Sequence, residues 1–368
     1  MTTRLESKLD SEGRYQGGTL QLWSLTYAAI FLSEYHMETG DRKVVKWLDF
    51  LSEELFSHQF HQMGPEAEAH LRALRERRGD RGDPVPPYWF AHGRVSPTSS
   101  GYVHLGVNAA NACLAWSLLA EAGANVDLEN LAATKDFIEE NCPSGAMGYA
   151  ATNGPNETPP DAFGRTGVLG LALHLDNDRK SYTKTVAESL ERQYPQNLYF
   201  SHATCVMGKA WGILAIASLD PGEFRKLMDS YRNDFDMIRL HDGSFVSNPA
   251  SKNGHGHIDL KGGDGSGHKW TTAFNALIYT LSTKRLRIAG GENTPKAEEV
   301  SKAPANPFRT FTSADGTGSF EGRLLIFDHK GGIVRISKRN GGTVDVDFEK
   351  LSKNDQQYLR EYHDAQQQ

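Results

Sequence analysis

The chain has 368 residues, of which 38% are hydrophobic and 23% charged, and its formal net charge is −6. This balance is typical of a folded globular protein and excludes a disordered chain. The mild acidity disfavours nucleic acid as a partner, because nucleic-acid-binding surfaces are usually basic.

Neither a membrane-spanning helix nor a signal peptide is expected from the sequence. No stretch of the sequence approaches the roughly 20 apolar residues that a membrane helix needs, so no membrane span is expected. Residues 1–18 lack the apolar core of a signal peptide. As written, the sequence predicts a cytoplasmic protein. A chain from which an export signal had been removed would read the same way, so the localisation is left open.

Most of the chain repeats one theme, a helix rich in small and apolar residues followed by a more charged helix. Four such pairs are readable, at 17–60, 99–142, 161–194 and 200–240, and a fifth apolar helix follows at 268–286. The first member of each pair is apolar nearly all round, which predicts burial on most sides. The second carries a single apolar stripe, which predicts one face in water. Alternation of the two kinds indicates two concentric layers in a repeat architecture.

Tight glycine turns return the chain from an outer to an inner helix at 144–149 and 242–245. Long loops interrupt the pattern at 62–100 and 248–267. Residues 291–305 are polar and contain proline, which is typical of a linker. Beyond them, apolar and polar residues alternate between glycine-rich turns at 330–332 and 340–342, which predicts three to five short strands in hairpins and then a short helix.

Residues 14–290 resemble an α/α toroid, the architecture of protein prenyltransferase β-subunits and squalene-type cyclases, and within it a bacterial family of unknown function. The segments that carry the resemblance are GGTLQLWSLTYAAIFLSEYHMETGD, GYVHLGVNAANACLAWSLLAEAG, DAFGRTGVLGLAL, HDGSF and WTTAFNALIYTLSTKRLRI. The fold class implied is mainly α. The Asp-rich signature of the cyclases is missing from this region, and the zinc ligands of the prenyltransferases have no assignable counterparts, so neither activity carries over.

Residues 306–363 are similar to the homology domain of the fungal endocytic adaptor Sla, through FRTFTSADGTGSFEGRLLIFDHKGGIVRISKRNGGTVDVDFEKLSKNDQQYL. The resemblance implies a small SH3-like β-barrel that binds peptides containing Asn-Pro-Phe, and therefore a protein or peptide partner. The chain carries its own Asn306-Pro307-Phe308 just before the module. A chance tripeptide that leads into the first strand is the simpler interpretation.

In a toroid, the N-terminal ends of the inner helices converge on one end of the central cavity, where their unpaired N–H groups and partial positive charge meet a ligand. The sequence places polar and aromatic residues at these ends. Those that could perform acid–base chemistry near neutral pH are His104, Asp161, His202 and His268. Those that could bind a sugar or another polar ligand are Trp23, Tyr27, Asn108, Arg165, Asp242 and Trp270.

Structural roles explain some of these residues equally well. Asp161 is placed to cap a helix, Arg165 could pair with a neighbouring helix, and His202 could bond a backbone carbonyl. The His255-Gly256-His257-Ile258-Asp259 loop lacks a clear third and fourth ligand, so a polar lid is preferred to a metal site. No nucleophile, phosphate-loop or dinucleotide signature is present, and no metal or cofactor is predicted. Three cysteines do not make a disulfide framework, and Cys113 and Cys205 are expected to be inert.

Two functions follow from this pattern. The first is a binding and scaffold protein, with a cavity for a carbohydrate or other polar ligand and a C-terminal module that docks a protein partner. The alternative is a toroid enzyme, a glycan hydrolase or lyase, that uses a His/Asp pair at the cavity end. The interaction module favours the first, and the fold does not choose between them.

Overall fold

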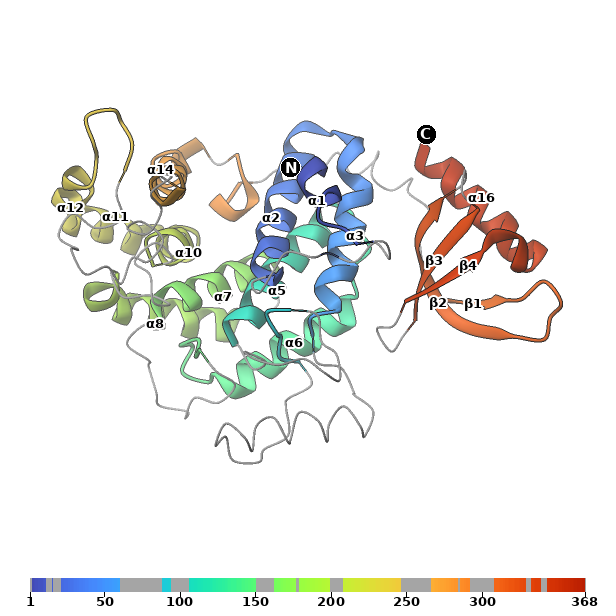
Figure 1. Cartoon of the computed structure of the whole chain (residues 1–368). Helices are drawn as coiled ribbons and strands as arrows, with labels where there is room; N and C mark the ends of the chain where they lie inside the picture. Colours follow the sequence, from blue (N-terminus) through green and yellow to red (C-terminus); the bar gives the residue numbers. More distant parts are fainter. Residues whose placement is uncertain are drawn as a thin grey trace, which may run out of the picture.

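The computed structural model describes thirteen parts of the chain. These are residues 2–10, 15, 21–59, 88–93, 106–149, 162–176, 179–198, 208–245, 266–283, 285–291, 308–328, 332–338 and 343–367. In them the chain is mainly helical, with a small antiparallel sheet near the C-terminus that lies to one side of the helices (Figure 1).

The inner helices pack side by side in sequence order. A short helix α1 (Thr2–Glu6) precedes them, and the inner elements are α2 (Gln21–Thr39), α5 (Gly106–Glu121), α7 (Phe163–Asp176), the π-helical turn η2 (Gly208–Gly212) with α10 (Ile213–Leu219), and α14 (Ser266–Tyr279). Contacts run from α2 to α5, α5 to α7, α7 to η2, and η2 to α14. Their composition explains this placement, since every residue of α5 from Gly106 to Leu119 is buried.

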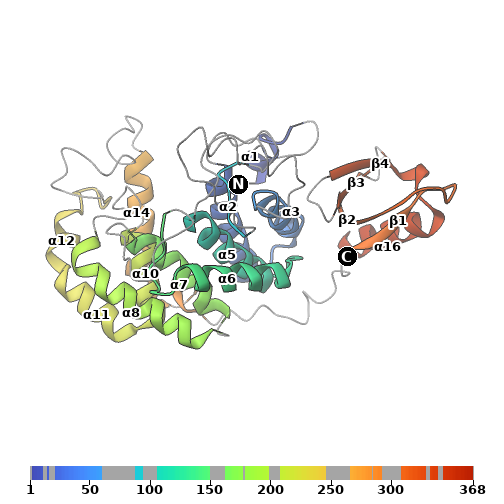
Figure 2. The ribbon, with the colours of Figure 1, turned by 90° about the horizontal axis from the view of Figure 1, so that it is seen from below.

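Each outer helix packs on the back of its own inner helix. The outer elements are η1 with α3 (Arg42–Val44 and Val45–Phe56), α6 (Leu128–Asn141), α8 (Lys180–Asn197), and α11 with α12 (Pro221–Ser230 and Arg232–Met237). In α11 only Leu227 is buried, as expected for a helix with one face in water. Figure 2 shows α11 and α8 along the lower edge of the helical region, below α10. The predicted alternation of helix types is therefore present in the described pairs.

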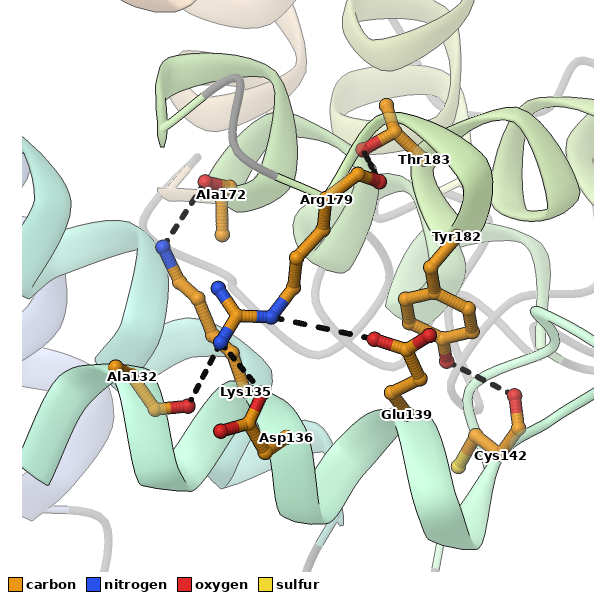
Figure 3. Close-up of polar contacts among 9 residues, drawn as sticks. All are labelled: Ala132, Lys135, Asp136, Glu139, Cys142, Ala172, Arg179, Tyr182 and Thr183. Carbon is orange, nitrogen blue, oxygen red and sulfur yellow. Dashed lines mark hydrogen bonds and ion pairs between the residues drawn. The ribbon is translucent and has the colours of Figure 1, made fainter.

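Polar contacts fasten the second outer helix to its neighbours (Figure 3). Lys135 of α6 is fully buried and its Nζ donates to Ser117 Oγ at 2.9 Å and to Ala172 O at 3.2 Å. At the start of α8, Arg179 Nη2 lies 2.6 Å from Asp136 Oδ1, and it donates to the Ala132 carbonyl. The Lys135–Ser117 bond lies within the second helix pair, and the other contacts cross from α6 to the third pair.

Two cysteines are free and buried. Burial raises the pKa of the Cys113 thiol to about 11, which keeps it protonated and unreactive near neutral pH. The predicted burial is confirmed for Cys113, whereas Cys205 lies outside the described residues. None of the helices in the described ranges is both long and apolar enough to cross a membrane.

The far end of the inner helices is held by the last turn of the helical region, η4 (Arg287–Ala289), which follows the 3-10 turn η3 (Leu281–Thr283). Glu34 of α2 accepts the N–H groups of Arg287 at 3.0 Å and Ile288 at 2.8 Å. The Arg287 guanidinium pairs with Glu121 at the end of α5. One short segment thus ties the first two inner helices to the end of the helical region.

The C-terminal region forms a four-stranded antiparallel meander in the order β1-β2-β3-β4. The strands are β1 (Arg309–Thr312), β2 (Ser319–Asp328), β3 (Ile333–Lys338) and β4 (Thr343–Asp347), then η5 (Phe348–Lys350) and α16 (Lys353–Gln367). A bulge in β2 shifts its register against β3 between Leu324 and Ile326. The predicted hairpins are confirmed. The helix predicted for the tail is present as α16, and its Leu359 and Tyr362 are buried in the core of the module.

Asp355 joins α16 to the sheet, and its removal is expected to unfold this module selectively. The carboxylate is 2% exposed, accepts Thr312 N at 2.9 Å and pairs with Arg309 Nη2 at 2.9 Å. Asp355→Ala leaves a half-buried cation and a backbone donor without this carboxylate and should cost about 3 kcal/mol. Urea unfolding can be monitored through the amide resonances of the module. In Asp355→Ala the module should unfold at a lower urea concentration than the helical region, because the two have separate cores.

The matched control is Asp345→Ala. Asp345 also pairs with an arginine, Arg335, at 2.7 Å, but its side chain is 43% exposed. This change should cost about 0.5 kcal/mol. Equal effects of the two substitutions would contradict the assigned role of Asp355.

Candidate functional site

Residues near the start of three inner helices form the core of the candidate site. Trp23, Asn108 and Arg165 are each the third residue of their helix, α2, α5 and α7. Two irregular segments, 88–93 and 145–149, join these ends. Leu22 N donates to His92 O at 2.9 Å, and Gly106 N donates to Tyr149 O at 3.1 Å. These contacts bring the beginnings of the three helices close together.

His92 lies between two of these helix ends. Trp23 Nε1 donates to His92 Nδ1 at 3.1 Å, and Asn108 Nδ2 lies 3.4 Å from the same nitrogen. An indole N–H can only donate, so Nδ1 is an acceptor and the neutral ring carries its proton on Nε2. Burial lowers the pKa of His92, which keeps the ring neutral near pH 7. His92 is therefore placed as a hydrogen-bond donor through Nε2, and its Nδ1 is occupied.

An aromatic row continues from His92 along α2 to the later inner elements. Trp23 and Tyr27 stack with ring centroids 6.3 Å apart, and Tyr27 stacks on Trp211 of η2 at 5.8 Å. Trp211 Nε1 donates to Tyr27 Oη at 3.2 Å, and Phe274 of α14 meets the Trp211 ring edge-on. Burial raises the pKa of Tyr27, so its phenol stays protonated. The row brings the first inner helix into contact with the fourth, which requires a curved arrangement.

Arg165 is fully buried, and its described contacts are with the segment after α6. Its Nε donates to Met147 O at 3.1 Å, and its guanidinium lies 5.7 Å from the Tyr149 ring centroid. These contacts fix the chain between α5 and α7. They match the structural alternative for this residue more closely than capture of an anionic ligand group.

The two glycine turns predicted as equivalents have the same geometry. Gly145 has φ +75° and Gly243 φ +83°, a left-handed conformation that favours glycine. Two residues after each glycine, a backbone N–H donates to a threonine near the start of the next inner helix. The pairs are Met147 N to Thr166 Oγ1 at 3.0 Å and Phe245 N to Thr272 Oγ1 at 2.9 Å.

Asp242 belongs to the second of these turns. It is exposed, and its Oδ1 accepts Ser244 N at 2.9 Å and the Ser244 hydroxyl at 2.7 Å. These bonds hold the pKa of Asp242 below its usual range. Through these two bonds, Asp242 shapes the turn that precedes α14.

The predicted acid–base residues fall where the structure gives no side-chain geometry. His104, Asp161 and His202 lie outside the described residues. His268 and Trp270 lie in the first turns of α14, but the structure describes only their backbone. The His255–Asp259 loop also lies outside it. In the described part of the chain, no three His, Cys, Asp or Glu side chains gather as metal ligands would.

Two residues of the site were not singled out in the sequence. His92 follows Trp89-Phe90 in a long loop, where an aromatic pair beside a histidine was the available signal. Trp211 sits in an apolar helix where a core role was the natural interpretation. Trp89 and Phe90 are fully buried, and they anchor the segment that presents His92.

Comparison with known proteins gives the chain a family. No curated protein and no solved structure matches the chain. A family model described as a domain of unknown function, DUF6288, matches residues 6–290, which includes every helix of the candidate site. The chain therefore belongs to the DUF6288 family.

Proposed function

We propose that the chain is a binding and scaffold protein, in which an α/α toroid holds a polar ligand and the C-terminal module docks a protein partner. The toroid is supported by the order of the inner helices and by the contact of Tyr27 with Trp211, residues 184 positions apart in sequence. A straight stack of helix pairs would keep α2 away from η2.

The ligand class that fits best is a neutral carbohydrate. The observation that carries this assignment is the pair of donors, Trp23 and Asn108, on His92 Nδ1. With Nδ1 accepting these bonds, His92 is a neutral ring that is unsuited to act as a general base through Nδ1, which favours binding of a neutral polar ligand over acid–base chemistry there. The neighbouring Trp23 ring, which is only partly buried, adds an apolar surface of the kind on which sugar rings pack.

The C-terminal module is proposed to be a small barrel related in function to the Sla homology domain. Its support is a separate hydrophobic core, formed by the sheet and α16. A module with its own core can act as an independent docking unit. Removal of residues 306–368 should abolish association with the protein partner and leave sugar binding by the helical region intact.

Saturation-transfer NMR with a panel of neutral oligosaccharides tests the ligand assignment on the full chain. At least one member of the panel should bind. Trp23→Phe keeps the aromatic ring but removes the donor to His92, and should weaken binding about fivefold, the effect of one orienting hydrogen bond of about 1 kcal/mol.

Trp47→Phe is the matched control, because Trp47 is a buried tryptophan of the outer helix α3 and should leave binding unchanged. The carbohydrate assignment fails if no sugar in the panel binds, or if Trp23→Phe and Trp47→Phe have the same effect. Release of new reducing ends or unsaturated sugars by the wild-type chain would replace it with the hydrolase or lyase alternative.

A further inference from the structure

The helical region and the β module meet at a seam between α3 and β2. Both views of the chain place the module beside α3 (Figures 1 and 2). Arg323 of β2 supplies its charged contact. Its Nη1 lies 3.0 Å from Glu53 Oε1 on α3 and 3.4 Å from the Asn125 carbonyl. The guanidinium also lies 4.6 Å from the Phe308 ring centroid of its own module. Arg323 and Phe308 together form the face that meets α3, here called the Arg323 face.

The seam buries polar groups that it does not fully satisfy. Arg323 Nε is buried without a hydrogen-bond partner among the described residues. Asp49 lies on α3 one turn before Glu53, and its carboxylate accepts Asn125 N at 2.8 Å. Burial raises the pKa of Asp49, which shows that its environment disfavours the charged form. Buried groups of this kind oppose closure, so the seam is weaker than its ion pair alone suggests.

The seam is also incompletely packed. A small open pocket of about 20 Å³, enough for about one water molecule, lies along it, and its lining includes Phe56, Trp116 and Phe308. Permanent interfaces resemble a domain core, whereas polar and loosely packed interfaces belong to contacts that form and break. The predicted linker, residues 291–305, separates the two parts in sequence, and its composition is polar and proline-containing.

We infer that the Arg323 face is a helix-binding surface, that α3 occupies it in a closed state, and that a partner helix of the same chemistry displaces α3. The chemistry is set by α3 itself. Glu53 and Phe56 are three residues apart and share one helix face, so they offer a carboxylate to Arg323 and an aromatic ring beside Phe308. The partner is therefore an amphipathic helix with a carboxylate and a phenylalanine one turn apart. This inference rests on the proposed docking role of the module.

The test uses the full chain and a fluorescein-labelled peptide that copies residues 43–58, KVVKWLDFLSEELFSH. The peptide carries the α3 chemistry, so it competes with α3 for the Arg323 face, and fluorescence anisotropy measures its affinity. Glu53→Gln in the chain weakens the internal contact and should tighten peptide binding by about threefold or more, since the open fraction of the chain rises. Arg323→Gln removes the cation that both helices use and should weaken peptide binding about tenfold.

The opposite signs separate this inference from a merely structural role of the two residues. Glu129→Gln, an exposed position on α6, is the matched control and should change nothing. The inference is overturned if Glu53→Gln fails to tighten peptide binding, or if Arg323→Gln binds the peptide like wild type. Circular dichroism checks that each variant is folded. If the peptide does not bind but removal of residues 306–368 still abolishes partner association, the docking role stands and this surface is the wrong one.

Discussion

Gly167→Ala is expected to lower the melting temperature of the helical region by about 5–10 °C, a loss of about 3 kcal/mol. Gly167 lies where α7 crosses η2. A Cβ built on it would stand 2.5 Å from Gly212 N and 2.5 Å from the carbonyl carbon and oxygen of Trp211. Those atoms are backbone, so relief requires the two inner helices to move apart. The greater helix propensity of alanine, about 1 kcal/mol, offsets only part of this strain.

The same substitution should disturb the candidate site. Trp211 is pushed by the new methyl group, and its indole donates to Tyr27 in the aromatic row. Differential scanning calorimetry measures the stability, and the indole N–H resonance of Trp211 reports the loss of its hydrogen bond. Gly167, which allows α7 and η2 to approach closely, is thus expected to set the position of Trp211 against Tyr27.

Two other glycines serve as controls. A Cβ on Gly170, one turn later in α7, would stand 3.0 Å from a Leu219 methyl, which can move, so Gly170→Ala should shift the melting temperature by less than about 2 °C. A Cβ on Gly93 would have nothing within 4 Å, and Gly93→Ala should be neutral. Equal effects at all three positions would exclude close helix approach as the cause.

Glu34→Ala is expected to cost about 3 kcal/mol, because it removes the acceptor of two backbone N–H groups at η4. Glu34 is 5% exposed, and its two oxygens accept Arg287 N and Ile288 N. The contact between α2 and η4 would lose both of the hydrogen bonds that Glu34 accepts. Glu188→Ala is the control, since Glu188 is 51% exposed on α8 and pairs loosely with Lys184; it should cost less than about 0.5 kcal/mol.

The contribution of Glu34 to the free energy of unfolding is expected to fall as the pH rises. Burial raises the pKa of Glu34 in the folded chain above its ordinary value, although the two backbone N–H groups oppose the shift. The folded state then holds the proton more tightly than the unfolded state. The stability from this group is fully present below the ordinary glutamate pKa and is lost as the pH rises through the folded pKa. Glu34→Gln, which cannot titrate, should remove this step. Parallel pH profiles of wild type and Glu34→Gln would contradict the assignment.

The sequence by itself determined the helix pairs, the equivalence of the two glycine turns and the hairpins of the C-terminal module. Each depends on neighbours in the chain: apolar residues around a helix, a glycine at positive φ, and alternation along a strand. Trp23, Asn108 and Arg165 were placed correctly at the starts of helices for the same reason.

Only the tertiary structure decided which of these residues meet. His92 comes from a loop with no periodic pattern, and Trp211 has the sequence surroundings of a core residue, yet both join the row that begins at Trp23. The sequence left Arg165 open between ligand binding and a structural contact, and the fold buries it fully against the segment after α6. Contacts between residues 69 or 184 positions apart depend on how helices pack, and local sequence does not encode that distance.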